Sequence, residues 1–283
     1  MRTVYLNGRF VPEAEAVVSV FDRGFLYGDG VFETLRVHAG RPFQWREHWA
    51  RFARGAALLG IGMPVSETEL RGTVDRLIEV NAASDAVLRI QLSRGVGRRG
   101  YSPRGAEKPV LVASMHERPE APKDGWRLVT VSWRVDAGDP LNQIKSGNRL
   151  LQVMARREAE GQGADEALLL NRRGEVVSAS GANVFWIEGG TVFTPELGTG
   201  ALEGTTRGLV FRLLGRLSIP VREVSQTDGI PGGAQSVFLS LSSFGIVRVR
   251  QVDDVKFSTE GTIPGRLMEA YDEELIHQTR AAG

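Results

Sequence analysis

The stretch from Asp22 to Thr34 is Asp-Arg-Gly-Phe-Leu-Tyr-Gly-Asp-Gly-Val-Phe-Glu-Thr, and its last residues enter a predicted strand over Val31–Val37. Ala39-Gly40 follows this strand and is typical of a turn into Arg41-Pro42-Phe43. Upstream, Asn7-Gly8 divides Thr3–Val11 into a second predicted hairpin, because this dipeptide favours two-residue turns. The chain therefore begins with strands, and its N-terminus shows no apolar signal core.

Outward from this stretch, the pattern alternates between helices and strands. Apolar residues at helical spacing predict a helix over 45–59 that ends near Gly60, and the capping box Ser66–Glu69 predicts the start of a second helix. Further elements are predicted as strands at 86–93, 110–115, 126–135, 166–170, 183–187, 191–193, 237–241 and 246–252, and as helices at 147–160, 205–217 and 265–277. The polar segment 117–125 (ERPEAPKDG) is predicted to be a linker. We therefore expect an α+β protein with an N-terminal domain over 1–118, a linker over 119–125 and a larger C-terminal domain over 126–283.

The composition excludes several functional classes. The 283 residues are 42% hydrophobic and 24% charged, which is typical of a globular chain. There is no cysteine, so disulfides, thiolate nucleophiles and cysteine-rich metal sites are excluded, and a count of four histidines disfavours a histidine metal centre. The formal net charge of +1 predicts no nucleic-acid partner, and the lack of a long apolar run predicts no membrane partner. Together with the residue counts above, these features lead us to expect no metal and a cytoplasmic location.

Lysine is scarce, which narrows any amine chemistry to four residues. Lys108, Lys123 and Lys256 lie in polar segments and are predicted to be solvated. Lys145 follows Leu141 and Ile144 and precedes Ser-Gly-Asn. A lysine beside apolar walls can act as a nucleophile, although an ordinary surface lysine also fits this position.

Two further segments can bind anions. Gly95–Gly100 matches G-x-G-x-x-G, but no helix is predicted after it, so a mobile loop carrying Arg98 and Arg99 is favoured over a dinucleotide site. Arginines there suit a carboxylate, while a merely solvated loop remains an alternative. Gly204–Arg207 begins a helix, and Ser240–Ser243 ends a strand. Together these hydroxyl-rich turns suit a phosphate, although Thr205 or Thr206 could simply cap the helix.

Several segments together resemble the class IV aminotransferase family, the fold-type IV enzymes of pyridoxal 5'-phosphate (PLP). The segments that carry the resemblance are Asp22–Thr34, Glu47–Arg51, Ile144–Arg149, Asn183–Trp186 with Thr194-Pro195, and Gly204–Arg207. They occur in the order seen in that family and extend over roughly residues 3 to 275. The resemblance implies a small α/β domain, a larger pseudo-barrel domain, PLP between the two domains, and a homodimer whose partner chain helps to close the site.

The resemblance also implies roles for individual residues. Lys145 is similar to the lysine that binds PLP covalently, and Arg51 resembles the phosphate-binding arginine of the family. Thr205, Thr206 and Ser242 resemble the rest of the phosphate site.

One residue departs from the family pattern. The family places a glutamate opposite the pyridine nitrogen, whereas Ser178 occupies that place here. A hydroxyl can hydrogen-bond to this nitrogen but cannot balance a pyridinium charge, which weakens the case for fast transamination.

Three branches of the family remain in competition. Phe32–Arg36 departs from the Phe-Glu-Gly-Ile-Arg of branched-chain aminotransferases, and Arg99-Gly-Tyr101 departs from the Arg-x-His of D-amino-acid transaminases. Ser93–Ser102, Lys145–Leu150 and Ala164–Leu169 resemble 4-amino-4-deoxychorismate lyase.

The lyase branch implies that Lys145 acts as base and acid while pyruvate leaves and 4-aminobenzoate remains for folate synthesis. Arg99 and Tyr101 are then expected to hold a substrate carboxylate, and Thr34 is expected to line the pocket. A transaminase for D-amino or other small amino acids is the alternative, and a catalytically drifted PLP-binding protein is the third possibility.

Overall fold

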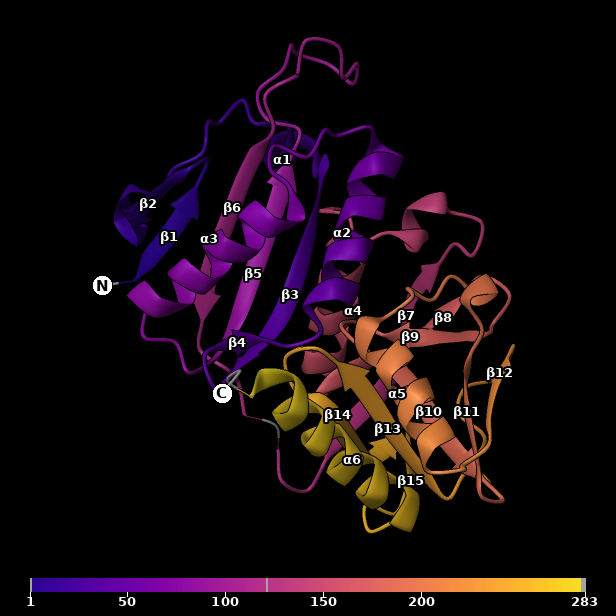
Figure 1. The fold of residues 1–283 in the computed structure, drawn as a ribbon. Helices are drawn as coiled ribbons and strands as arrows, with labels where there is room; N and C mark the ends of the chain where they lie inside the picture. Colours follow the sequence, from indigo (N-terminus) through magenta and orange to yellow (C-terminus); the bar gives the residue numbers. More distant parts are fainter. Residues whose placement is uncertain (1, 121, 281–283) are drawn as a thin grey trace. The chain divides into compact units, whose positions relative to one another are not determined.

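The computed structural model describes residues 2–120 and 122–280, and its contacts divide the chain into two compact units (Figure 1). Unit 1 comprises Met1–Arg118, Ile144–Asn148 and Leu275–Gly283, and unit 2 comprises Pro119–Gln143 and Arg149–Glu274. Each unit combines helices with a sheet, so the predicted α+β class is confirmed. The exact domain limits stay a prediction, and we note that residues 144–148, with Lys145, make their contacts in unit 1.

Unit 1 is an antiparallel sheet with helices α2 (Trp45–Leu59) and α3 (Glu67–Val80) packed on it. In spatial order its strands are β2 (Arg9–Pro12), β1 (Thr3–Leu6), β6 (Val110–His116), β5 (Asp85–Ser93), β3 (Gly30–His38) and β4 (Arg41–Pro42). The predicted hairpin at Asn7-Gly8 is confirmed, and both turn residues have the positive φ that such turns require. The short helix α1 (Arg23–Tyr27) precedes β3.

Local sequence explains where the two long helices begin and end. The Ser66 hydroxyl accepts a hydrogen bond from Glu69 N, and the Glu69 carboxylate accepts one from Ser66 N, so the predicted capping box is confirmed. α2 ends at Gly60, whose φ of 64° is the left-handed conformation that glycine adopts without a steric cost. The apolar stripe of α3 is buried against the sheet.

Unit 2 is built on a nine-stranded sheet that curls into a half barrel (Figure 1). In spatial order the strands are β12 (Val221–Val224), β11 (Thr191–Pro195), β10 (Asn183–Glu188), β13 (Ser236–Leu241), β14 (Gly245–Val252), β7 (Trp126–Val135), β8 (Glu166–Asn171) and β9 (Val176–Ala179), with β15 (Val255–Lys256) paired to β14. The helices of unit 2 are α4 (Leu150–Gly161), α5 (Thr205–Arg216) and most of α6 (Thr262–Thr279), whose residues from Leu275 on belong to unit 1. The single turns of 3-10 helix are η1 (Glu13–Glu15) in unit 1 and η2 (Pro140–Gln143) and η3 (Leu197–Thr199) in unit 2.

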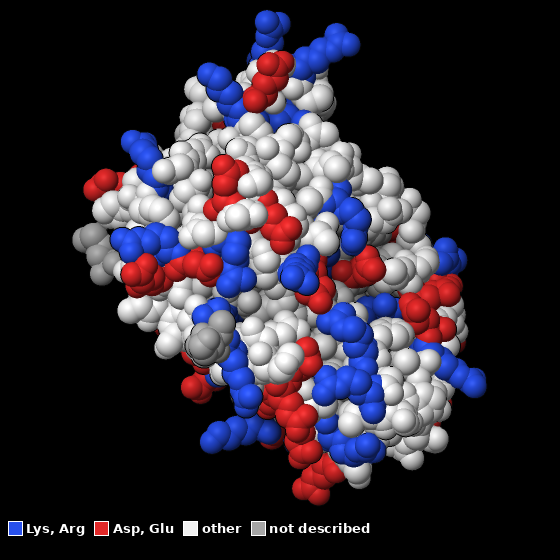
Figure 2. Space-filling view, in the orientation of Figure 1, with Lys and Arg blue, Asp and Glu red and all other residues white. Residues whose placement is uncertain are grey.

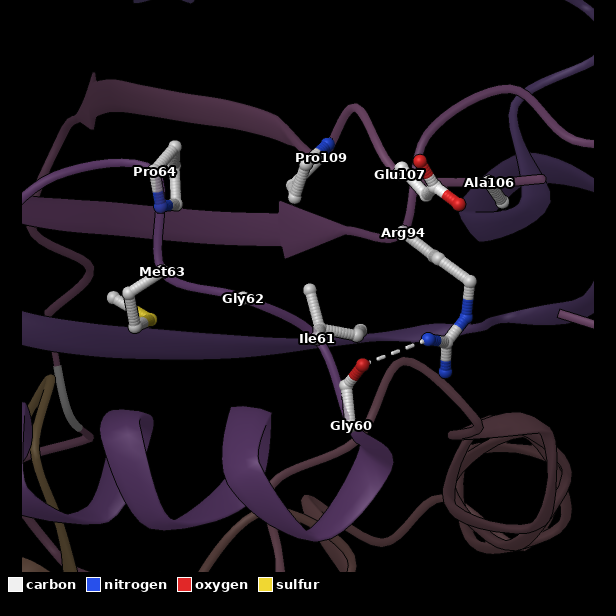
Figure 3. A pocket seen from close by; sticks show the side chains of 9 residues that line it. All are labelled: Gly60, Ile61, Gly62, Met63, Pro64, Arg94, Ala106, Glu107 and Pro109. Atoms are coloured by element: carbon white, nitrogen blue, oxygen red, sulfur yellow. Dashed lines mark hydrogen bonds between the residues drawn. The ribbon is translucent and has the colours of Figure 1, made fainter. Parts of the chain in front are cut away.

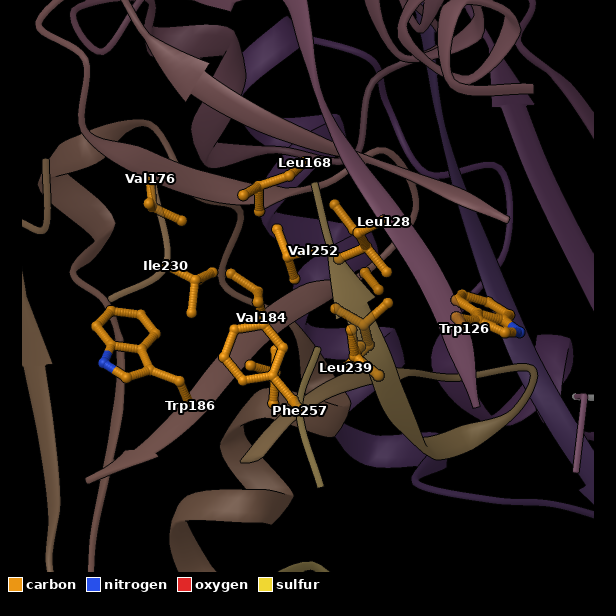
Figure 4. Close-up of a cluster of buried hydrophobic side chains, with 14 of the residues drawn as sticks. Trp126, Leu128, Leu168, Val176, Val184, Trp186, Ile230, Leu239, Val252 and Phe257 are labelled. Atoms are coloured by element: carbon orange, nitrogen blue, oxygen red, sulfur yellow. The ribbon is translucent and has the colours of Figure 1, made fainter. Parts of the chain in front are cut away.

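Both faces of this sheet are buried, which matches its apolar strands. On β7, Trp126 and Leu128 belong to one core cluster, whereas Val129 and Val131 belong to another together with residues of α4. Figure 4 shows the first cluster, in which side chains from β7, β8, β10, β13 and β14 meet. Side chains alternate between the faces of a strand, so one strand serves two cores.

Two predicted helix starts are wrong by three residues. The helix expected from residue 147 begins at Leu150, because Gly147 N donates to the carbonyl of Gly30 and Ser146 forms a bridge to Val31. The last helix begins at Thr262 rather than residue 265. Pro264 lies in its first turn, where a missing N–H breaks no helical hydrogen bond.

The surface is of mixed charge. Basic and acidic side chains are interspersed over the face shown in Figure 2, in keeping with the near-zero net charge. Within the part of the chain that the structure describes, no helix is long and apolar enough to span a membrane.

Candidate active site

Lys145 lies alongside β3, in the segment between η2 and α4. Its carbonyl accepts a 3.0 Å hydrogen bond from Phe32 N, and the neighbouring Ser146 bridges to Val31. The half-buried side chain places Nζ 4.6 Å from the centre of the Phe32 ring. Strand β3 therefore fixes both the backbone and the aromatic contact of the predicted PLP lysine.

The same ring also contacts an arginine that the sequence analysis missed. Cζ of Arg89, on β5, lies 3.6 Å from the centre of the Phe32 ring. Burial lowers the pKa of Arg89, and the nearby carboxylate of Glu33 opposes that shift. Apart from this ring contact, the side chain of Arg89 makes no hydrogen bond or ion pair within residues 2–120 and 122–280. A partly buried guanidinium whose N–H groups have no acceptor is suited to a carboxylate of a ligand.

Thr34 belongs to the same face of the unit 1 sheet. It pairs directly with Arg89 across β3 and β5, and it lies two residues from Phe32 on β3. Directly opposed residues of antiparallel strands project to one side. The structure thus brings the predicted residues Lys145 and Thr34 to one face, together with Arg89.

The opposite face of β3 carries a buried ionic cluster. Glu33 accepts hydrogen bonds from Nε and Nη2 of Arg51, each 2.7 Å long, and from Nδ1 of His48 at 2.6 Å. All three side chains are almost fully buried between β3 and α2. His48 and Arg51 are three residues apart on α2, so their side chains lie on the same face of the helix and both contact Glu33.

The protonation states in this cluster follow from its geometry. Burial alone would raise the pKa of Glu33, but the charge and hydrogen bonds of Arg51, with the hydrogen bond from His48, lower it to about 2. Burial lowers the pKa of His48 and outweighs the attraction of Glu33. His48 is therefore neutral at pH 7, and its Nδ1–H donates to the ionised Glu33.

Arg51 is thus held by Glu33 in this structure, and its predicted contact with the cofactor phosphate stays a prediction. The sequence analysis missed Glu33 and His48. Two features of the sequence could have indicated them. Glu33 is an acidic residue within a mostly apolar strand, and His48 lies one helical turn before Arg51.

Unit 2 contains the hydroxyl-rich turns predicted to hold phosphate. Thr205 and Thr206 are buried at the start of α5, and Thr205 Oγ1 lies 3.5 Å from the hydroxyl of half-buried Ser242. The Thr206 hydroxyl is buried and has no hydrogen-bond partner in the described chain. The helix cap is Gly204, without a side-chain cap bond, so the expectation that a threonine caps this helix was wrong.

This turn fits a phosphate group. The first N–H groups of α5 have no partner within the helix, and a helix N-terminus favours negative charge. Gly204 leaves no room for a side chain, because an added Cβ would lie 2.1 Å from Asn183 Oδ1. An unpartnered buried hydroxyl, a second threonine and the N-terminus of α5 are together suited to an anion, and the phosphate site stays a prediction.

Replacing Thr206 with valine tests this assignment. Valine removes the unpaired hydroxyl and keeps the shape, so we expect the cofactor-free protein to be as stable as wild type or more stable by about 1 kcal/mol. PLP affinity should fall about tenfold, since a hydrogen bond to a charged group is lost. Thermal unfolding without cofactor and PLP titration measure the two effects. Unchanged PLP affinity would contradict the assignment.

Ser178 lies half-buried on β9, paired with Leu169 of β8. The buried carboxylate of Glu166, on the adjacent strand, accepts hydrogen bonds from Ala167 N at 2.7 Å and from the hydroxyl of Ser180 at 2.5 Å. It also forms an ion pair with Arg156 at 3.2 Å. This carboxylate is therefore held by Ala167, Ser180 and Arg156.

Arg99 and Tyr101 lie on the loop between β5 and β6. No helix follows Gly95–Gly100, so the loop prediction is confirmed and the dinucleotide alternative is excluded. The side chain of Tyr101 is 87% exposed, and its ring centre lies 5.6 Å from that of Tyr27. Both residues are presented at the surface of unit 1.

A pocket of about 410 Å³ lies at the base of this loop but contains none of the predicted site residues (Figure 3). Its one arginine, Arg94, donates to both carboxylate oxygens of Asp29 and to the carbonyls of Leu59 and Gly60. With these bonds made, Arg94 is poorly placed to attract an anionic ligand into the pocket.

The predicted residues thus fall into two groups. In unit 1, Lys145 and Thr34 share a sheet face, Arg51 lies on the other face, and Arg99 and Tyr101 lie on a loop. In unit 2, Thr205, Thr206 and Ser242 gather at the start of α5, and Ser178 lies on β9.

Comparisons with known proteins agree on one family. The model of the family described as amino-transferase class IV matches residues 30–252. A Methanocaldococcus jannaschii protein named "Putative branched-chain-amino-acid aminotransferase" is 37% identical over 272 residues, 95% of this chain and 94% of that protein. The aminodeoxychorismate lyase of Bacillus subtilis is 29% identical over 287 residues, 99% and 97% of the two chains. The solved structure of the T.th. branched-chain amino acid aminotransferase with pyridoxamine 5'-phosphate superposes with a TM-score of 0.91 at 29% identity, covering 99% of this chain and 95% of that one.

Proposed function

The chain belongs to the class IV aminotransferase family, and from this premise we propose that it is a 4-amino-4-deoxychorismate lyase, which releases pyruvate and leaves 4-aminobenzoate for folate synthesis. The family is one of PLP-dependent enzymes that act on small amino compounds. The substrate and the reaction type are our proposal.

The residues of this chain fit the cofactor. Thr205, Thr206 and Ser242, with the N-terminus of α5, would bind its phosphate, Arg51 would add a positive charge, and Lys145 would bind it covalently. Ser178 would face the pyridine nitrogen with a hydroxyl. When bound, PLP withdraws electrons from the substrate carbon that carries the amino group.

Lys145 performs the proton transfers in this proposal. With the cofactor and substrate bound, Nζ would act first as base and afterwards as acid while pyruvate leaves. Arg99 and Tyr101 hold a substrate carboxylate, and Thr34 lines the pocket.

The observation that carries the lyase proposal is the absence of a carboxylate at residue 178. A serine cannot keep the pyridine nitrogen protonated, and the buried carboxylate of the adjacent strand, Glu166, is already bound by Ala167 N, the Ser180 hydroxyl and Arg156. Elimination of pyruvate makes the substrate ring aromatic, and this gain compensates for a weaker electron sink. The similarity to the lyase of Bacillus subtilis also supports the proposal.

An aminotransferase acting on D-amino or small branched-chain amino acids is the second candidate. It is favoured by the 37% identity to the Methanocaldococcus jannaschii protein. The two candidates differ in one chemical property, since only a transaminase transfers the amine of its donor to the cofactor.

We further propose that the enzyme is a cytoplasmic homodimer. The segment of residues 17–26 exposes large apolar side chains, which a second copy would cover. These side chains are Val17, Val18, Val20, Phe21, Phe25 and Leu26.

Replacing Arg99 with alanine tests the substrate loop. We expect KM for aminodeoxychorismate to rise about tenfold or more, because a charge-assisted hydrogen bond to the carboxylate is lost, while PLP absorbance is unchanged. Arg104→Ala, in the same exposed loop, is the matched control and should leave KM near the wild-type value. Loss of PLP from the Arg99 variant would contradict the assigned role.

The reaction itself is tested by adding aminodeoxychorismate to the holoenzyme and measuring pyruvate. Release of pyruvate together with 4-aminobenzoate is the expected result. If there is no pyruvate and the cofactor is converted to its amine form by D-alanine or a branched-chain amino acid, the second candidate replaces the first.

A further inference from the structure

The side chain of Arg23 joins helix α1 to the loop that carries Arg99. Its Nη1 donates to the carbonyls of Gly100, at 2.9 Å, and Ser102, at 3.2 Å, and its Nη2 donates to the carbonyl of Tyr101, at 3.0 Å. Arg23 is only 4% exposed. One buried guanidinium thus binds three consecutive backbone carbonyls of the loop.

The loop itself is otherwise exposed. Arg98, Arg99, Ser102 and Arg104 are exposed, and the hydroxyl of Tyr27 accepts a 3.3 Å hydrogen bond from Gly100 N. Charge-assisted hydrogen bonds are stronger than neutral ones, so the three bonds from Arg23 dominate the anchoring of this turn.

Arg23 is in turn fixed to the body of unit 1 through Asp29. Arg23 Nε donates to Asp29 at 2.8 Å, and Arg94 donates to both oxygens of the same carboxylate. Burial would raise the pKa of Asp29, but hydrogen bonds from Arg94 and Arg23 lower it, so the carboxylate stays ionised. Arg94 also binds the carbonyls that end α2. The loop is therefore connected, through two arginines and one carboxylate, to the end of α2.

We propose that Arg23 is the positioning residue of the substrate loop. By fixing the carbonyls of residues 100–102, it sets the direction in which Arg99 and Tyr101 face the substrate. The inference rests on the proposed function in one respect, namely that these two residues hold a substrate carboxylate. Arg23 itself touches neither substrate nor cofactor in this proposal.

Lysine cannot replace arginine here. A guanidinium has five N–H donors in a planar fork, and Arg23 uses this fork to reach Asp29 on one side and three carbonyls on the other. An ammonium is a single point with three donors and can keep only the ion pair with Asp29 together with one carbonyl. The variant Arg23→Lys therefore retains the buried charge but releases most of the turn.

The experiment uses the holoenzyme in four forms: wild type, Arg23→Lys, Arg99→Ala and the double variant. For Arg23→Lys we expect KM for aminodeoxychorismate to rise about tenfold, with little change in kcat or in PLP absorbance, because misplacement of a binding group weakens substrate binding. In the Arg99→Ala background, the same substitution should raise KM by clearly less than in wild type, since the part of its effect that acts through Arg99 is already lost. Full multiplication of the two effects would overturn the inference.

Limited trypsin digestion provides a readout that needs no substrate. Cleavage after Arg98, Arg99 or Arg104 should be at least about fivefold faster in Arg23→Lys, because the turn opens more often. Arg118→Lys is the matched control, because Arg118 forms an ion pair with Asp85 in unit 1 and donates to no carbonyl of the loop. Cleavage in the loop and KM should therefore stay near wild type in this variant. Equal cleavage rates in wild type and Arg23→Lys would overturn the inference.

The two proposals fail in different ways. If wild type releases no pyruvate, or if Arg99→Ala alone leaves KM unchanged, the proposed function is wrong, while the trypsin experiment still decides whether Arg23 anchors the loop. If Arg99→Ala raises KM and Arg23→Lys does not, the proposed function stands and the positioning role is wrong.

Discussion

Lys145→Ala should lower turnover by at least about 10³-fold and abolish the visible absorbance band of the lysine-bound cofactor. Lys145 is held alongside β3 by the hydrogen bond from Phe32 N, and its Nζ lies over the ring of Phe32. Neither Arg89 nor Arg51 can replace it, because a guanidinium is protonated at any working pH and cannot act as a nucleophile or base. The measurement is an absorption spectrum with added PLP, followed by the pyruvate assay.

A matched control separates the lysine's chemistry from a general effect. Lys256, on β15, is exposed, and Lys256→Ala should retain both the absorbance band and the activity. Lys145→Ala should also keep its far-ultraviolet circular dichroism, because the removed side chain is only half-buried. A Lys145 variant with the wild-type absorbance band would show that another group binds the cofactor.

Glu33→Gln should lower the free energy of unfolding by about 3 to 5 kcal/mol, because it removes one partner of a buried ion pair. Arg51 would lose the charge that compensates it, and the one amide oxygen of glutamine could not accept all the hydrogen bonds that the two carboxylate oxygens accept from Arg51 and His48. Chemical denaturation of the cofactor-free protein measures the change. Glu79→Gln on α3 breaks an exposed ion pair with Arg76 and should cost less than about 1 kcal/mol. An equal loss of unfolding free energy in the two variants would contradict the stabilising role of the buried cluster of Glu33, His48 and Arg51.

The pH dependence of stability follows with a definite sign. The pKa of Glu33 is lowered from 4.5 to about 2, so its contribution of about 3 kcal/mol is present above pH 4.5 and is lost as the pH falls to 2. His48 acts in the same direction, because burial lowers its pKa from 6.5 and the unfolded chain takes up a proton first. The gap between wild type and Glu33→Gln should narrow as the pH falls from 4.5. A constant gap down to pH 2 would contradict the ionised state of Glu33.

Local signals in the sequence were sufficient for most of the fold. Asn7-Gly8, the capping box at Ser66 and Gly60 each act through a few neighbouring residues, and each produced the expected turn, start or end. Residues 147–149 were different, because their non-helical conformation depends on hydrogen bonds to Gly30 and Val31, more than 100 residues away in the chain. Contacts of this kind are not visible in a local pattern.

The residues of the candidate site also differ in whether a local pattern could predict them. The scarcity of lysine singled out Lys145, and two hydroxyl-rich turns predicted the start of α5 as an anion site. Glu33 and Arg89 escaped notice because each is a charged residue within a mostly apolar strand, and its role depends on the side chains that pack over that strand. The anchoring of the loop by Arg23 could not be foreseen either, since it depends on how a side chain meets carbonyls almost 80 residues later.

The most direct test of the proposed lyase is the absorption spectrum of the purified holoenzyme with D-alanine or a branched-chain amino acid and no keto acid, followed by aminodeoxychorismate. We predict that the amino acids leave the visible band in place, and that aminodeoxychorismate yields pyruvate and 4-aminobenzoate in equal amounts. Bleaching of the band by either amino acid to the amine form of the cofactor, with no pyruvate from aminodeoxychorismate, would contradict the lyase and establish a transaminase.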